Sequence, residues 1–162
     1  MAGRTYRYFK GQPVYGFGYG LSYTTFKYSN VKLSTKFFKA GDTLTVEADV
    51  RNTGTRAGDE VAELYVTPPS TAVSSLHALD GFTRLHLGPG ATQHIAFKLD
   101  PRTLSQVDEH GDRAVTPGEY KLFAGDSQPN PISPSTTFTI TGSQTIPHWI
   151  VSHLPLGGRV GL

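Results

Sequence analysis

The densest cluster of potentially reactive side chains is a short run in the second half of the chain, Asp108-Glu109-His110-Gly111-Asp112. Carboxylates and an imidazole this close together could hold a metal ion or supply a general acid. The run lacks the downstream bidentate glutamate and the ligand spacing of a calcium loop. Asp and Gly are also the residues that tight turns prefer. We therefore expect a hairpin turn here and no metal loop.

A second candidate is a pair of histidines, His86 and His94, which flank Gly88-Pro89-Gly90. The apolar residues on either side predict two strands joined as a hairpin across this turn, with both imidazoles opposite each other on the solvent face. A zinc site needs three or four ligands. The chain has no cysteine, and no third ligand is evident near the two histidines. We expect exposed cross-strand histidines and no metal site.

Hydrolytic chemistry by two carboxyl groups requires that their surroundings separate the two pKa values. The chain has 13 Asp and Glu residues, but almost all fall in turns or at polar strand positions, where nothing would raise a carboxyl pKa. No serine-nucleophile motif is present, and the G-x-G at 16–18 is not followed by a strand–helix unit. We assign no catalytic residue and expect no cofactor.

The first 28 residues form an aromatic segment that contains nine of the 18 aromatic residues of the chain, interleaved with glycine and basic residues. This is more aromatic surface than a short arm can bury against itself. The arm must therefore lie on the rest of its own domain, on another domain or on a ligand. Tyr23, Phe26 and Tyr28 lead into the first predicted strand, and we expect them to belong to the local core.

Two functions of the arm remain open: an interdomain seam, and a platform on which sugar or lignin rings stack. Aromatic residues are enriched at protein interfaces, and nine rings in one arm exceed what a carbohydrate platform normally uses, so we favour the seam. The candidate contact residues are Arg4, Tyr6, Arg7, Tyr8, Phe9, Tyr15, Phe17 and Tyr19.

The remaining elements are predicted to be strands. Glycine and proline occur every 8–15 residues with short β-rich runs between them, which is typical of an antiparallel sandwich. Leu44, Val46, Ala48 and Val50 alternate with polar residues, as in a half-buried strand. The clearest helical signal is one turn after Asp100, because Asp is a favoured N-cap and proline suits the position that follows it.

Length and composition indicate one domain with an ordinary core. The chain has 162 residues and a net charge of +2, and no apolar run approaches the roughly 18 residues of a membrane helix. Residues 1–58 hold nine Lys and Arg against three Asp and Glu. These basic residues are spread singly and form no block, so we expect neither a nucleic acid nor a membrane as partner.

Several motifs, taken together, resemble a known family. They are GRTYRYF and YGFGYGLSYTTFKYSN at the start, NTGTRAGDEV followed by ELYV at 52–66, LDGFTRL at 79–85, LGPG at 87–90 and PGEYKLFAG at 117–125. In this order they are similar to the C-terminal fibronectin type III-like domain of glycoside hydrolase family 3, the β-glucosidases and β-xylosidases. The resemblance covers about residues 3–141.

The resemblance implies an immunoglobulin-like antiparallel β-sandwich of about seven strands, fibronectin type III-like, over residues 23–142. An aromatic arm or interdomain linker (1–22) would precede it, and a tail (143–162) would follow. Both catalytic carboxylates of the family lie in other domains. We therefore expect a non-catalytic accessory domain that stabilises the catalytic domains and aids the approach of polymeric substrate. The alternative is an independent module that binds polysaccharide or lignin. Such a parent enzyme would be secreted or periplasmic, although the chain shows no signal peptide.

Overall fold

The computed structural model describes residue 3 and residues 5–69, 75–108, 110–130, 133 and 135–147. These residues form eleven strands and one helical turn. The elements are β1 (Phe26–Leu33), β2 (Phe37–Lys39), β3 (Leu44–Asn52), β4 (Gly58–Thr67), β5 (Ala78–Leu87), β6 (Thr92–Leu99), α1 (Pro101–Leu104), β7 (Gln106–Val107), β8 (Arg113–Val115), β9 (Gly118–Gly125), β10 (Thr136–Thr141) and β11 (Gln144–Ile146).

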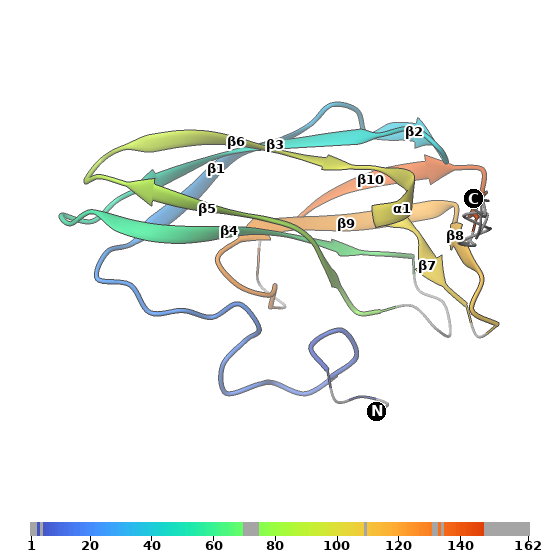
Figure 1. Cartoon of the computed structure of the whole chain (residues 1–162), viewed down its shortest axis with the longest axis horizontal. Helices are drawn as coiled ribbons and strands as arrows, with labels where there is room; N and C mark the ends of the chain where they lie inside the picture. Colours follow the sequence, from blue (N-terminus) through green and yellow to red (C-terminus); the bar gives the residue numbers. More distant parts are fainter. Residues whose placement is uncertain are drawn as a thin grey trace, which may run out of the picture.

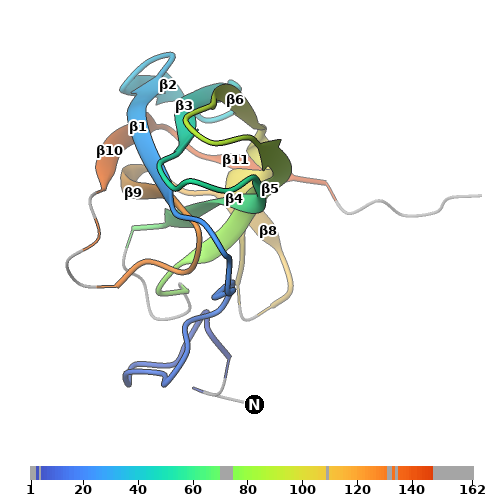
Figure 2. The same ribbon diagram turned by 90° about the vertical axis from the view of Figure 1, so that its left-hand side faces the viewer.

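The predicted β-sandwich is confirmed. One layer is a three-stranded sheet in the order β1-β3-β6, and the other is a five-stranded sheet in the order β2-β10-β9-β4-β5. The two layers lie face to face in Figure 1, and the view in Figure 2 shows the N-terminal arm on the outer side of the five-stranded sheet. Neighbouring strands run antiparallel except β2 and β10, which pair in parallel.

The core lies between the two main sheets and follows the alternation of the strands. Leu44, Val46, Ala48 and Val50 of β3 are all buried, as the sequence predicts. Tyr120 of β9 is fully buried; its ring stacks on Phe138 with centroids 5.2 Å apart, and its hydroxyl donates to the Thr116 carbonyl at 2.8 Å. This core needs neither a disulfide nor a metal ligand from cysteine, because the chain has no cysteine.

The hairpin predicted across Gly88-Pro89-Gly90 is wrong. β5 pairs with β4 in the five-stranded sheet, while β6 pairs with β3 in the other sheet. The turn therefore carries the chain from one layer to the other. Its Gly90 N–H donates to the Asn52 carbonyl at 3.0 Å, which fastens the turn to the end of β3.

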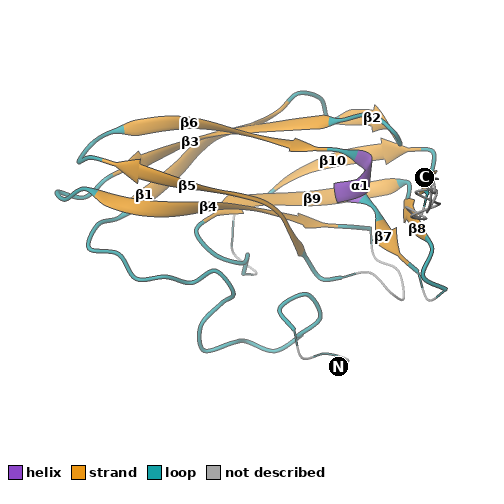
Figure 3. Cartoon of the chain, in the orientation of Figure 1, coloured by secondary structure: helices purple, strands orange, loops and turns teal. Residues whose placement is uncertain are grey.

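The predicted helical turn is present as α1, drawn in purple in Figure 3. The Asp100 carboxylate caps it by accepting from the Thr103 N–H at 2.8 Å. Beyond α1 a small third sheet forms in the order β11-β8-β7. None of the helical segments within the described residues has the length and apolar character needed to span a bilayer.

Candidate interdomain face

The arm, residues 5–25, turns twice and is fastened to the sandwich at several points. The amides of Tyr8 and Phe9 both donate to the Thr5 carbonyl, which closes the first turn, and the Tyr19 amide donates to the Gly16 carbonyl in the second. Two further bonds reach the sandwich: the Leu76 N–H donates to the Arg7 carbonyl at 2.7 Å, and the Gln128 N–H donates to the Phe17 carbonyl at 2.8 Å. The arm thus folds back on its own domain (Figure 2).

Tyr6 is the centre of the contact between the arm and the sheet. Its ring stacks on Phe17 with centroids 4.1 Å apart and meets the edge of Tyr65 of β4 at 6.3 Å. The Tyr6 hydroxyl accepts a hydrogen bond from the Leu79 N–H at 3.1 Å. The ring of His77 lies 5.8 Å away, and burial lowers the pKa of that imidazole. A strand position that faces away from the core, Tyr65, is therefore buried by the arm.

The outward side of β4 also carries a buried carboxylate. Glu63 accepts a hydrogen bond from the Tyr65 hydroxyl at 2.6 Å. Burial raises the pKa of Glu63, the Tyr65 hydrogen bond lowers it, and Asp126 adds to the rise. Burial and the neighbouring Glu63 also raise the pKa of Tyr65. Gly18 lies against this carboxylate with a φ of 82°, and a side chain there would overlap Glu63. Only glycine allows the arm to approach β4 this closely.

Most aromatic rings of the arm remain accessible to solvent even though the arm is folded back. Tyr15 is 69% exposed and Tyr19 52%, and their ring centroids are 5.1 Å apart with planes inclined by 35°. Tyr8, Phe9 and Phe17 are also exposed. The rings thus form neither a fully buried layer nor a flat row. They form a second apolar surface on the outside of the arm.

The structure brings most of the candidate contact residues to this one face, whereas Arg4 lies outside the described residues. Tyr6 and Phe17 contact each other, Tyr15 pairs with Tyr19, and Arg7 lies beside Asp80, whose pKa it lowers against the effect of burial. The expectation that Tyr23 belongs to the local core is wrong, because its side chain is 91% exposed. Phe26 and Tyr28 are half-buried and pack against the core, as expected.

Sequence reasoning missed the surface that receives the arm, namely Glu63, Tyr65, His77 and Gln128. The alternation of apolar residues along β4 identifies only the residues that face the core. A weak signal exists in hindsight: an aromatic and an acidic residue occupy successive outward positions of a central strand.

The buried carboxylates Glu60 and Glu63 do not flank a common site. They lie on opposite sides of β4, because alternate residues of a strand face opposite ways. Glu60 faces the space between the sheets and accepts a hydrogen bond from the Tyr28 hydroxyl at 2.6 Å. Burial raises the pKa of Glu60 and of Tyr28. Each carboxylate is thus tied to its own tyrosine, and no general acid–base pair results from them.

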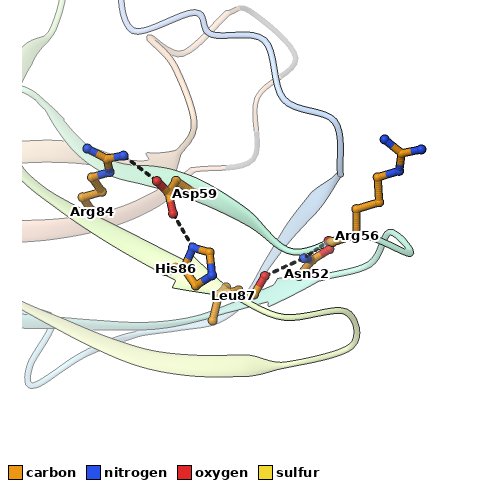
Figure 4. A network of polar contacts seen from close by, with 6 residues as sticks. All are labelled: Asn52, Arg56, Asp59, Arg84, His86 and Leu87. Carbon is orange, nitrogen blue, oxygen red and sulfur yellow. Dashed lines mark hydrogen bonds and ion pairs between the residues drawn. The ribbon is translucent and has the colours of Figure 1, made fainter.

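The expectation that His86 and His94 lie opposite each other is also wrong, because their strands belong to different sheets. His86 Nδ1 lies 2.5 Å from Asp59, which also pairs with Arg84 (Figure 4). His94 Nδ1 lies 2.8 Å from Asp49. Within the described residues, no group of three or more His, Asp or Glu side chains is arranged to hold a metal ion.

The polar motif at 52–54 closes one end of the sandwich. Asn52 is fully buried, and its amide nitrogen donates to the carbonyls of Arg56 at 2.7 Å and Leu87 at 2.9 Å (Figure 4). Its Oδ1 accepts from the Thr24 hydroxyl at 2.6 Å and from the Gly54 N–H at 3.0 Å. One side chain therefore ties together the end of the arm, the β3–β4 turn and the end of β5.

The acidic run is a turn, as predicted. Asp108 accepts hydrogen bonds from the backbone N–H groups of His110 and Asp112, both at 2.9 Å, and so closes the connection between β7 and β8. Desolvation raises the pKa of Asp108, but these hydrogen bonds and the nearby His110 outweigh it, so that the pKa is lowered overall. Glu109 lies outside the described residues.

The family model for the fibronectin type III-like domain matches residues 60–128. A β-xylosidase of Formosa agariphila is 40% identical over 123 residues, which is 75% of this chain and 17% of the relative. A periplasmic β-glucosidase of Salmonella typhimurium is 35% identical over 124 residues, or 75% of this chain and 16% of the relative. Residues 60–128 thus belong to the fibronectin type III-like family, and the chain is similar to the segment of glycoside hydrolase family 3 enzymes that carries this domain.

Solved structures agree with this assignment of the fibronectin type III-like domain. β-Glucosidase 3B of Thermotoga neapolitana, in complex with α-D-glucose, superposes on 87% of this chain with a TM-score of 0.76 and 34% identity, and the match covers 19% of that enzyme. The chain thus spans less than a fifth of the length of these relatives and neighbours. The resemblance seen in the sequence motifs is confirmed.

Proposed function

We propose that this fibronectin type III-like domain is a non-catalytic accessory domain of a family 3 β-glucosidase or β-xylosidase. In this proposal residues 1–22 form the seam with the catalytic domains, residues 23–142 form the supporting sandwich, and residues 143–162 form a C-terminal tail that begins with β11. The domain stabilises the catalytic part and aids the approach of polymeric substrate.

One observation carries the proposal: the arm is anchored on β4 and β5, yet its outer aromatic rings are exposed. Tyr15, Tyr19 and Tyr23 are each more than half exposed. Exposed apolar surface of this kind marks interaction sites. The relatives are several times longer than this chain, and in this proposal the remainder of such a protein provides the partner surface for the arm.

The test is a chimera in which this chain replaces the matching segment of the Thermotoga neapolitana enzyme. We expect the chimera to hydrolyse an aryl β-glucoside, whereas the chain alone does not. Tyr15→Ala combined with Tyr19→Ala should lower the melting temperature of the chimera by several degrees and leave that of the isolated domain nearly unchanged. Phe37→Ala is the matched control, because Phe37 is an exposed aromatic residue, 73% accessible, on the distant strand β2.

The opposite result identifies the second candidate function, a module that binds polysaccharide or lignin. The pair of exposed rings, Tyr15 and Tyr19, is the observation that favours it. In that case the double variant would lose binding to insoluble polysaccharide or lignin, while the stability of the chimera would not change.

A further inference from the structure

A cleft of about 420 Å³ lies between the arm, the start of β5 and the α1–β8 end of the domain. Its volume falls in the range of roughly 300–1,000 Å³ that is typical of small-molecule sites. Its described lining is mostly polar or charged and includes Arg7, Tyr8, Asp80, Arg102, Ser105 and Arg113.

Three arginines from three different elements line this cleft. Arg7 comes from the arm, Arg102 from α1 and Arg113 from β8. The Arg113 guanidinium is held in place by donating to the Ser105 hydroxyl at 3.1 Å. Guanidinium groups stay charged at all relevant pH values, and their planar fork matches a carboxylate.

Asp80 is the one acidic residue among the described residues that line the cleft. It sits at a β-bulge, because Leu64 pairs with Gly81 and Tyr65 pairs with Leu79, which leaves Asp80 without an opposite residue on β4. Burial raises the pKa of Asp80 to about 7, against the opposing effect of Arg7. The cleft therefore holds an excess of positive charge at neutral pH, and this excess grows as Asp80 is protonated.

We propose that the cleft binds a uronic acid, an acidic sugar unit, through its carboxylate. Arg102 and Arg113 would bind the carboxylate, Arg7 would add positive charge from the arm, and the half-exposed Tyr8 ring would contact the sugar ring. The choice of a saccharide rests on the proposed function, but the arginine cluster does not. The experiment needs only this chain, so its outcome is independent of the chimera.

The direct test is titration of the whole chain with sodium D-glucuronate, followed by calorimetry and by the NMR signals of the arginine side chains. We expect saturable binding, no comparable binding of D-glucose, and weaker binding of acetate. Arg102→Gln and Arg113→Gln should each weaken binding roughly tenfold, as expected for loss of a hydrogen bond to a charged group. Arg51→Gln, which removes an exposed arginine on β3, is the matched control and should have no effect.

Asp80 allows a second test, in which loss of a charge is expected to strengthen glucuronate binding instead of weakening it. The other charged groups that line the cleft are Arg7, Arg102 and Arg113, and guanidinium groups in proteins keep their charge over this pH range. Glucuronate should therefore bind more tightly as the pH falls below 7, while its own carboxylate remains ionised. Asp80→Asn should tighten binding at pH 8 and abolish this pH dependence.

Three results would overturn the proposal. Acetate could bind as well as glucuronate, neutral D-glucose could bind as well as glucuronate, or Arg102→Gln could leave the affinity unchanged. Arg102→Gln is the decisive variant if Arg113→Gln fails to fold, because the Arg102 side chain is exposed. A melting curve of each variant establishes that it is folded before it is titrated.

Discussion

Two tyrosines in this domain make nearly the same local contacts in very different surroundings. Tyr120 in the core stacks on Phe138, and its hydroxyl is hydrogen-bonded to a backbone carbonyl. Tyr6 in the arm stacks on Phe17, and its hydroxyl is hydrogen-bonded to a backbone N–H. Tyr120 is fully buried, whereas Tyr6 is half-buried and the ring stacked on it is exposed. Ring stacking and a hydroxyl hydrogen bond therefore do not by themselves show that a tyrosine belongs to the core. How much each ring contributes to stability depends on how completely the surrounding protein excludes solvent from it.

The largest expected effect is at Tyr120. Tyr120→Ala should lower the free energy of unfolding by about 3 kcal/mol, because a large ring leaves a cavity that the two sheets cannot fill. Urea denaturation measures this. Tyr120→Phe is the matched control, and it removes only the hydrogen bond to Thr116 at a cost of about 1 kcal/mol. A loss below about 1 kcal/mol for the alanine variant would mean that Tyr120 is no part of the core.

Asn52 extends the comparison of Tyr120 and Tyr6 to a buried polar side chain. Asn52→Ala should cost about 2 kcal/mol, because it leaves the buried carbonyl of Leu87 without its donor. Thr53→Ala is the control, since the neighbouring Thr53 side chain is exposed. Equal stability of both variants in denaturant titration would contradict the role of Asn52 in closing the sandwich.

Tyr6 should matter less than either. Tyr6→Ala is expected to cost about 1 kcal/mol, the usual value of an aromatic pair beyond its buried area. Hydrogen exchange at the Leu79 amide should become faster, because that N–H loses the Tyr6 hydroxyl. Exchange within β3 should not change. If Tyr6→Ala instead cost as much as Tyr120→Ala, the arm would be part of the core.

The smallest expected effect is a pH dependence of stability that arises from Glu63, which the arm covers. The pKa of Glu63 is raised in the folded state, so the folded domain binds more protons than the unfolded chain above the unfolded-state pKa of about 4.3. Stability should fall as the pH rises through this value and through the folded-state pKa. Glu63→Gln should flatten this part of the stability curve, measured by urea titration at several pH values. Glu47→Gln on β3 is the control, and an unchanged curve for Glu63→Gln would contradict the burial of Glu63.

The alternation along residues 44–50 is enough to predict which side chains face the core, because it depends only on strand geometry. The motifs also predict the sandwich and its relation to family 3 glycosidases. Strand partners cannot be predicted this way: Leu87 and Ile95 flank one short turn, yet they lie in different sheets. Alternation likewise cannot predict that Tyr65 is buried, because the cover comes from Phe17 and Tyr6, far away in the sequence.

The bond between Phe17 and Gln128 has a consequence for how the protein is made. The two residues are 111 positions apart, and Phe17 is synthesised before Gln128. At about 5–20 residues per second, a ribosome needs roughly 5–20 s to travel from Phe17 to Gln128. During that interval the aromatic arm has left the ribosome, or is about to leave it, without the part of its receiving surface that Gln128 supplies. The arm therefore cannot be fastened at Gln128 until the last strands of the sandwich are being made.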